Sequence, residues 1–199
     1  EEEDEGIVSL DTMLRGTCDP VRLMDIFQNF LLFDGDGAEV VKLMAKNHQY
    51  IGVNKVVSQT RNGEDLKGKL GVFWHTQGSG KSYSMVFLCQ KLLRKFGKSY
   101  TFLIVVDRTE LENQLYDTFT GVGAVTEENV RAKSRDHLRE LLAENHRYVF
   151  TLIHKFSIDP KKEKEYPLIT YRSNIIVISD EAHRTQGGKF AQNMRFHGI

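Results

Sequence analysis

The stretch GVFWHTQGSGKS, residues 71–82, sets the expectations for the whole chain. Its first four residues are apolar and predict a buried strand. A glycine loop at residues 78–80 follows, and then Lys81 and Ser82 precede the helical pattern MVFLCQKLLRKF. Glycines allow a backbone turn whose N–H groups face an anion, and the positive end of the following helix points at the same place. This order of elements predicts a phosphate-binding loop.

The loop departs from the pattern G-x-x-x-x-G-K-[ST], because His75 stands at the position of the first glycine. A chance match in a surface loop is the alternative, and the strand before and the helix after the motif argue against it. In a phosphate-binding loop, Lys81 would reach the β- and γ-phosphates, and the Ser82 hydroxyl would ligate Mg²⁺.

Composition narrows the class of protein. With 199 residues, 40% of them hydrophobic, the chain can bury the core of one α/β domain with some decoration. Basic and acidic residues both number 27, so no overall positive field predicts nucleic-acid binding, although a local basic groove stays open. Cys18 and Cys89 fit no metal spacing and are expected as free thiols in a reducing compartment. No apolar run reaches membrane-spanning length and no signal peptide opens the chain, so we expect a cytoplasmic protein.

Strands and helices alternate along the sequence. Helices are predicted at residues 20–32, at 39–58 as one or two helices, at 82–95, after a cap at Asp107, and at 136–144; strands are predicted at 71–74, 100–106, 148–153 and 174–179. Uninterrupted apolar runs such as YTFLIVV are typical of strands covered on both faces of a parallel sheet. The pattern predicts an α/β fold, a doubly wound parallel sheet in three αβα layers with an N-terminal helical lead-in.

A second motif follows the last predicted strand and reads Asp180-Glu181-Ala182-His183. Ligands of open α/β sheets bind at the carboxyl ends of strands, so this motif is expected beside the phosphate loop. We assign Asp180 to Mg²⁺ and Glu181 to the attacking water. Neighbouring strand residues point in different directions, so adjacent carboxylates can take two roles. The alternative is that the pair only opens a loop.

Both motifs resemble those of a known class. HTQGSGKS and ISDEAH are similar to motifs I and II of superfamily 2 helicases and translocases. The longer stretches FWHTQGSGKSYSMVFLCQKL, IVVDRTELENQL, TLIHKF and VISDEAHRTQGGKFAQNMR resemble the motor (R) subunit of type I restriction enzymes. The resemblance runs from about Ser9 to the end and is sharpest between Trp74 and Gln186. It implies a RecA-like fold, ATP and Mg²⁺ as cofactors, double-stranded DNA as the track, and modification and specificity subunits as partners.

The resemblance also implies roles for single residues. The nucleotide-binding set would be Thr76, Gln77, Gly78, Ser79, Gly80, Lys81 and Ser82. Gln49 is similar to an upstream glutamine that reads adenine, since an amide offers the donor and acceptor which the adenine edge requires. An ordinary exposed helix glutamine is the alternative. His183 matches a residue that couples the nucleotide site to DNA or to a second motor lobe, or else it packs under a loop.

Further matches lie in two segments that border the DNA path in the family: Arg108, Thr109 and Gln114 in the first, and Thr151 and Lys155 in the second. Arg108 and Lys155 could bind DNA phosphates, or each could be a solvated surface charge.

The resemblance sets the expected domain plan. Residues 1–36 are expected as a tail and helical linker, and residues 37–199 as the first RecA-like lobe. The missing initiator Met and the absence of a closing element suggest a piece of a longer protein. No Ser-Ala-Thr motif follows, so the second lobe with its arginine, and the nuclease carboxylates, are expected outside these 199 residues.

Two other functions stay open. The chain could be the first lobe of another DEAH-type nucleic-acid-dependent ATPase or helicase of superfamily 2. It could also be an interaction module with a vestigial nucleotide site, although the intact Lys81, Asp180 and Glu181 argue against that function.

Overall fold

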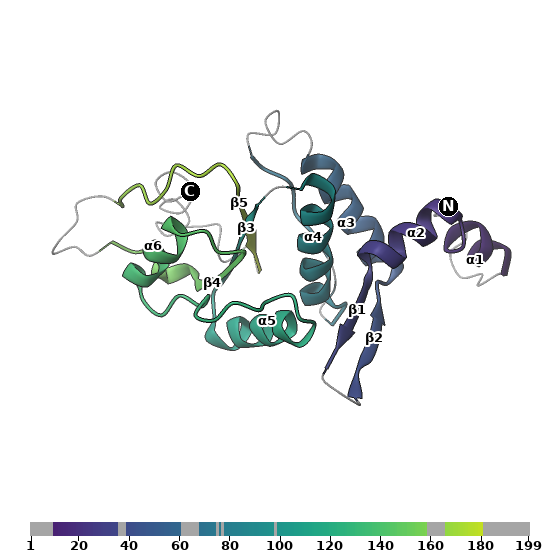
Figure 1. The fold of residues 1–199 in the computed structure, drawn as a ribbon, viewed down its shortest axis with the longest axis horizontal. Helices are drawn as coiled ribbons and strands as arrows, with labels where there is room; N and C mark the ends of the chain where they lie inside the picture. Colours follow the sequence, from purple (N-terminus) through teal and green to yellow (C-terminus); the bar gives the residue numbers. More distant parts are fainter. Residues whose placement is uncertain are drawn as a thin grey trace. The chain divides into compact units, whose positions relative to one another are not determined.

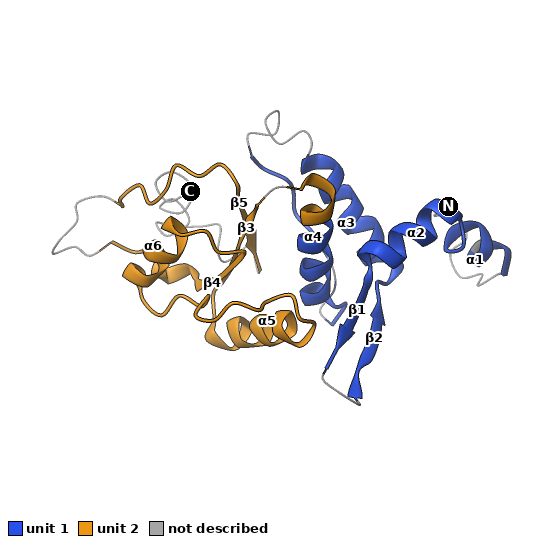
Figure 2. Ribbon diagram, viewed as in Figure 1, with its two compact units in different colours: residues 1–91 blue, residues 92–199 orange. Residues whose placement is uncertain are grey.

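The computed structural model describes residues 10–35, 39–60, 68–74, 76, 78–97, 99–158 and 166–180. The chain forms two compact units, residues 1–91 and 92–199, which Figure 2 distinguishes by colour. This boundary falls inside a helix. The predicted division into residues 1–36 and 37–199 stays a prediction.

Figure 1 labels the α-helices and strands of both units. The first unit contains α1 (Leu10–Gly16), α2 (Pro20–Asn29), β1 (Leu31–Asp34), β2 (Val41–Met44), α3 (Asn47–Thr60) and most of α4 (Lys81–Phe96). The second contains β3 (Thr101–Val106), α5 (Thr109–Gly121), α6 (Arg135–Ala143), β4 (Tyr148–Leu152), η2 (Ile153–Lys155) and β5 (Ile175–Ser179).

Helix α2 starts where the sequence predicts. The Asp19 carboxylate accepts hydrogen bonds from the backbone N–H groups of Val21 and Arg22, at 3.1 and 3.0 Å, and Pro20 occupies the first helical position. An N-cap carboxylate of this kind satisfies amides that have no partner within the helix. The helix nevertheless ends at Asn29, three residues earlier than predicted.

The hairpin β1–β2 corrects two helix predictions, those at residues 20–32 and 39–58. β1 pairs antiparallel with β2, with Leu32 opposite Leu43. The apolar run at 31–33 extends the helical stripe of α2 in the sequence, but Leu32 is buried through strand pairing instead. Only from Asn47 onward does the predicted helix form, as α3.

The predicted buried strand at residues 71–74 is also wrong. None of these residues is in a strand, and the side chains of Val72 and Trp74 are 74% and 86% exposed. The half-buried Phe73 instead packs against α3 at Gly52, where an added Cβ would lie 1.9 Å from the ring. This segment is therefore held by a helix, at Phe73.

In the second unit, β3 lies between β4 and β5, and all three strands are parallel. The observed strands agree with the predicted strands at 100–106, 148–153 and 174–179. Every side chain of β3 and β4 is buried. Such complete burial is typical of a parallel sheet with helices on both faces, which is the doubly wound α/β arrangement predicted from the sequence.

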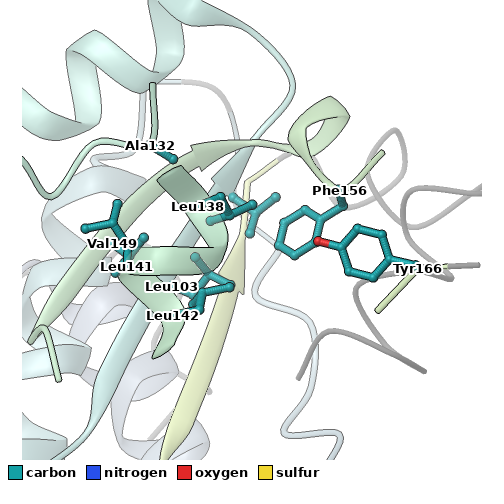
Figure 3. Close-up of a cluster of buried hydrophobic side chains, with 9 residues drawn as sticks. Leu103, Ala132, Leu138, Leu141, Leu142, Val149, Phe156 and Tyr166 are labelled. Carbon is teal, nitrogen blue, oxygen red and sulfur yellow. The ribbon is translucent and has the colours of Figure 1, made fainter. Parts of the chain in front are cut away.

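The two faces of this sheet pack against different helices. Leu103 and Val149 belong to the same buried cluster as Leu138, Leu141 and Leu142 of α6, which Figure 3 shows. On the opposite face, the ring of Phe119 from α5 lies 5.3 Å from that of Tyr148 and 5.5 Å from that of Phe150. Alternate strand residues therefore bury against opposite helical layers, which gives the three αβα layers.

The start of α5 and the state of the two cysteines were also predicted from the sequence. Helix α5 begins at Thr109 with Arg108 as its cap residue and no side-chain cap hydrogen bond, so the expected cap at Asp107 is wrong. Cys18 and Cys89 are free thiols, as predicted. In the described part of the chain, no helix is long and apolar enough to cross a membrane.

Candidate phosphate-binding site

The glycine loop has the backbone conformation that the sequence predicts for a phosphate-binding loop. Gly78 and Gly80 have φ angles of +77° and +84°, in the left-handed region that favours glycine. The N–H of Ser79 donates to the carbonyl of Thr76 at 3.3 Å, which closes a tight turn. A Cβ added at Gly78 would meet no atom of the described residues within 4 Å.

Helix α4 begins directly after this turn. Lys81 is its first residue and Ser82 its second, and both side chains are partly exposed. The N–H of Ser84 donates to the Gly80 carbonyl at 3.1 Å, so the loop leads into the helix through a regular first turn. A 16-residue helix directs its positive dipole end and its unpaired amides toward this loop. Lys81 and Ser82 therefore stand where an anion would be favoured.

Helix α3 contacts the glycine loop through two side chains. The Nε2 atom of His48 lies 3.1 Å from the Ser79 carbonyl oxygen, and Gln49 donates to the Gly80 carbonyl at 2.9 Å. Gln49 is only 4% exposed, so it is no ordinary exposed helix glutamine. Its side-chain oxygen accepts from the backbone N–H of Lys46 at 2.8 Å. The amide of Gln49 thus joins the start of α3 to the glycine loop.

Helix α4 is fixed at two further points in the first unit. Near its start, the Tyr83 hydroxyl donates to Asp34 of β1 at 2.6 Å, and this hydrogen bond, together with burial, raises the pKa of Tyr83 to about 12. Farther along, the Lys91 ammonium lies 2.5 and 2.6 Å from the two oxygens of Asp25 in α2. Burial opposes ionisation of Asp25, but hydrogen bonds from Lys91 and Asn29 hold its pKa below the usual value.

The second unit, described by itself, has the carboxyl edge of a parallel sheet. Asp180 directly follows β5, and its N–H donates to the Val105 carbonyl at 3.0 Å, which places it at the end of β3 and β5. Arg108 and Thr109 follow β3 at the same edge and are exposed. In open α/β sheets this edge is the ligand edge. Asp180 therefore lies at the edge where the sequence placed it, and Arg108 and Thr109 lie at the same edge.

The other two predicted DNA contacts are turned inward. Thr151 is completely buried within β4. The Lys155 ammonium donates to the Ala132 carbonyl and lies 3.9 Å from a Glu112 oxygen. In this structure neither side chain faces solvent as a phosphate contact would. Gln114, on α5, is exposed.

Three predicted site residues lie outside the described residues: Gln77, Glu181 and His183. In the described residues, no cluster of three or more His, Cys, Asp or Glu side chains could hold a metal ion.

Sequence reasoning missed the buried carboxylate Glu112. It accepts from Arg131 at 3.0 Å, and Arg131 also donates to Asn113 and lies over the Tyr116 ring, 5.1 Å from its centroid. Glu112, Leu115 and Phe119 follow the i, i+3, i+7 spacing of one helix face. That spacing was the available signal that Glu112 lies on the buried face of α5.

The structure has glycines with positive φ just before a long helix, and a parallel sheet between helical layers. These two features define an α/β domain of the phosphate-loop ATPase class. Comparison with known families then narrows the class. Residues 48–197 match the family described as SWI2/SNF2 ATPase, and the chain belongs to that family.

The curated relatives are restriction enzyme subunits. Over 192 residues, the chain is 42% identical to "Type I restriction enzyme HindI endonuclease subunit" of Haemophilus influenzae, and the match covers 93% of this chain. It is 36% identical to "Putative type I restriction enzyme MjaIXP endonuclease subunit" of Methanocaldococcus jannaschii, with 94% of this chain covered. The chain spans 18% of the length of each of these two relatives.

A shorter relative is covered more fully. The chain is 33% identical to the C-terminal part of the "Putative type I restriction enzyme MpnIIP endonuclease subunit" of Mycoplasma pneumoniae. That match covers 71% of this chain and 70% of the relative. The resemblance to the R subunit of type I restriction enzymes is thereby confirmed.

Proposed function

We propose that this chain is the ATP-binding lobe of a DNA translocase within a type I restriction endonuclease subunit. The loop at Gly78 and Gly80, held in its left-handed turns against α3, carries this proposal. Membership of an ATPase family and similarity to restriction endonuclease subunits support it. Double-stranded DNA would be the track, and the modification and specificity subunits of the restriction complex would be the partners.

The glycine loop and the start of α4 have the donors that a bound nucleotide requires. The loop amides and Lys81 would hold the phosphates, and Ser82 with Asp180 would hold Mg²⁺, which neutralises developing charge on the phosphates. Glu181 would accept a hydrogen bond from the attacking water and orient it. His183 would couple the site to DNA or to a second lobe.

DNA contact would come from the carboxyl edge of the sheet. Arg108 and Thr109 are exposed there, as a contact with DNA phosphates requires. Thr151 is buried and Lys155 is turned inward, so in this proposal they would act on DNA only after a rearrangement of the edge.

Replacing Lys81 with Ala tests the site. Loss of one charge-assisted contact, worth about 1.5–3 kcal/mol, should weaken ATP binding about ten- to a hundredfold. Lys95→Ala is the matched control, because Lys95 is an exposed lysine near the other end of the same helix. Calorimetric titration with Mg²⁺-ATP measures both variants. Equal affinities for wild type and Lys81→Ala would refute the assignment.

A second assay tests which nucleic acid the protein acts on. Phosphate release by the protein that carries this lobe should rise with double-stranded DNA and stay unchanged with double-stranded RNA. Stimulation by RNA alone would favour another nucleic-acid-dependent ATPase of superfamily 2.

A further inference from the structure

Two consecutive side chains of α3 contact two consecutive carbonyl groups of the glycine loop. Nε2 of His48 lies 3.1 Å from the Ser79 oxygen, and Nε2 of Gln49 lies 2.9 Å from the Gly80 oxygen. A carbonyl oxygen can only accept a hydrogen bond, so Nε2 of His48 carries the hydrogen. Both peptide units that precede Lys81 are thus held by α3 through their carbonyl groups.

The two hydrogen bonds to α3 also fix the directions of the backbone N–H groups in the same peptide units. A trans peptide unit is planar, and its C=O and N–H point in opposite directions. The described part of the chain contains no cis peptide bond. Because the carbonyls of Ser79 and Gly80 point toward α3, the N–H groups of Gly80 and Lys81 point away from it. Amides at this place in a phosphate loop are the donors for an anion.

We propose that His48 and Gln49 are positioning residues that orient the Gly80 and Lys81 amides toward the nucleotide phosphates. The proposal rests on the proposed function of the loop as an ATP site. It gives Gln49 a role toward the phosphate loop, whereas the family resemblance implies a role toward the adenine base.

The hydrogen bonds of Gln49 support this role. The Gln49 amide nitrogen donates to the Gly80 carbonyl and to Ser84 Oγ at 3.2 Å, while the side-chain oxygen accepts from Lys46. Both ends of the amide are therefore hydrogen-bonded inside the protein. Reading the adenine edge requires a donor, whereas the Gln49 nitrogen faces two acceptors of its own chain.

The geometry of Gly80 fits the same role. A Cβ at this position would lie 2.9 Å from Nε2 of Gln49, and φ is +84°. Glycine therefore permits both the left-handed turn and the close approach of the Gln49 amide.

Gln49→Ala and Gln49→Glu test the proposal with three probes: Mg²⁺-ATP, Mg²⁺-GTP and inorganic tripolyphosphate, which has no base. Gln49→Glu keeps the size of the side chain and its acceptor for Lys46 but removes both donors. Gln49→Ala should weaken the binding of all three probes by a similar factor, about three- to tenfold, as expected for lost neutral hydrogen bonds. Gln49→Glu should weaken all three further, because its carboxylate faces the loop carbonyl and repels the phosphates. Gln59→Ala, the same change at an exposed position of α3, should leave all three affinities unchanged.

The outcomes separate the two roles. A loss confined to ATP, with GTP and tripolyphosphate binding unchanged, would show that Gln49 reads adenine and would overturn the proposal. Unchanged affinity for every probe in both variants would overturn it as well.

A measurement without nucleotide keeps the proposal distinct from the proposed function. Hydrogen exchange of the amides at residues 78–84 should quicken in Gln49→Ala and in His48→Ala, because the loop loses its hold on α3. If wild type binds none of the probes but the exchange still quickens, the ATP site is refuted while the positioning of the loop stands. Unchanged exchange in both variants would refute the positioning role.

Discussion

Single buried charged side chains fix pairs of elements in both units. Lys91 is only 5% exposed, and its ammonium binds Asp25 of α2 and stands 4.7 Å from the centroid of the Phe30 ring. Glu112 of α5 is equally buried and binds Arg131. A buried charge is costly unless it is paired, so each pair favours one relative placement of its two segments.

His146 offers a test of charge at the residue scale. Its Nδ1 lies 2.9 Å from a Glu127 oxygen and its Nε2 lies 2.8 Å from a Glu144 oxygen. With carboxylates at both ring nitrogens, the charged imidazolium satisfies both contacts by donating. Burial opposes the charge, but the hydrogen bonds to Glu127 and Glu144 outweigh it and raise the pKa of His146 above its usual value.

The sign of the resulting pH dependence follows from this shift. A group whose pKa is higher in the folded state stabilises the fold fully below its unfolded pKa and loses that contribution as pH rises through the folded pKa. Replacing His146 with Gln should therefore lower the melting temperature at pH 5 and have a smaller effect at pH 8 to 9. Thermal unfolding of both proteins across this range measures it. His137→Gln is the comparison, because the Nδ1 atom of His137 accepts from the Lys133 N–H at 3.0 Å instead of facing a carboxylate. An equal loss for His146→Gln at both ends of the range would show that the imidazolium contributes nothing.

At the scale of elements, the sequence correctly predicted the helices and strands whose apolar pattern matches the side chains that are buried in the structure. α4, β3, β4 and β5 were predicted nearly to the residue, because continuous apolar runs and helical periodicity persist over their whole length. The hairpin was missed because residues 31–33 prolong the apolar stripe of α2, and only pairing with β2 reveals a strand. Residues 71–74 were misjudged because apolar residues alone do not determine whether a partner strand is adjacent.

The candidate site shows the same division. The glycine turn and the helix start were predicted, because backbone conformation there follows from local sequence. The bonds from Gln49 to Gly80 and the inward turn of Lys155 were not, because they join residues far apart in the sequence.

Helix α3 and the segment before the glycine loop provide a test at this scale. Gly52 faces Phe73 so closely that a Cβ would lie 1.9 Å from ring atom Cε2. Gly52→Ala should destabilise the fold by about 1–3 kcal/mol through overpacking, although alanine alone favours a helix by about 1 kcal/mol. Urea unfolding gives the change in the free energy of unfolding.

A double-mutant cycle isolates this contact. In a Phe73→Ala background the ring is gone, so Gly52→Ala should instead stabilise the fold by about 0.5–1 kcal/mol. If Gly52→Ala has the same effect in both backgrounds, the ring does not limit the space beside Gly52, and another neighbour must explain any loss.

At the scale of the whole molecule, this chain is compared with relatives that are far longer. It spans 18% of the restriction endonuclease subunits that it matches at 42% and 36% identity. From the motif resemblance, we expect an arginine of a second lobe to complete the site in the longer protein. An arginine supplied in this way is worth about 10³–10⁵ in rate. Binding and hydrolysis should therefore separate when the 199-residue chain is assayed by itself.

We expect the isolated chain to bind Mg²⁺-ATP weakly, because loop amides and Lys81 are present while other walls of the cleft would come from the second lobe. Phosphate release should stay at background, with and without double-stranded DNA, whereas the complete protein should hydrolyse ATP when DNA is added. Both assays use equal molar concentrations of site, and Lys81→Ala in each sets the background. DNA-stimulated hydrolysis by the isolated chain at the rate of the complete protein would show that these residues alone form the whole catalytic site. The role of a second lobe in hydrolysis would then be refuted, while the assignment of the glycine loop to ATP would stand.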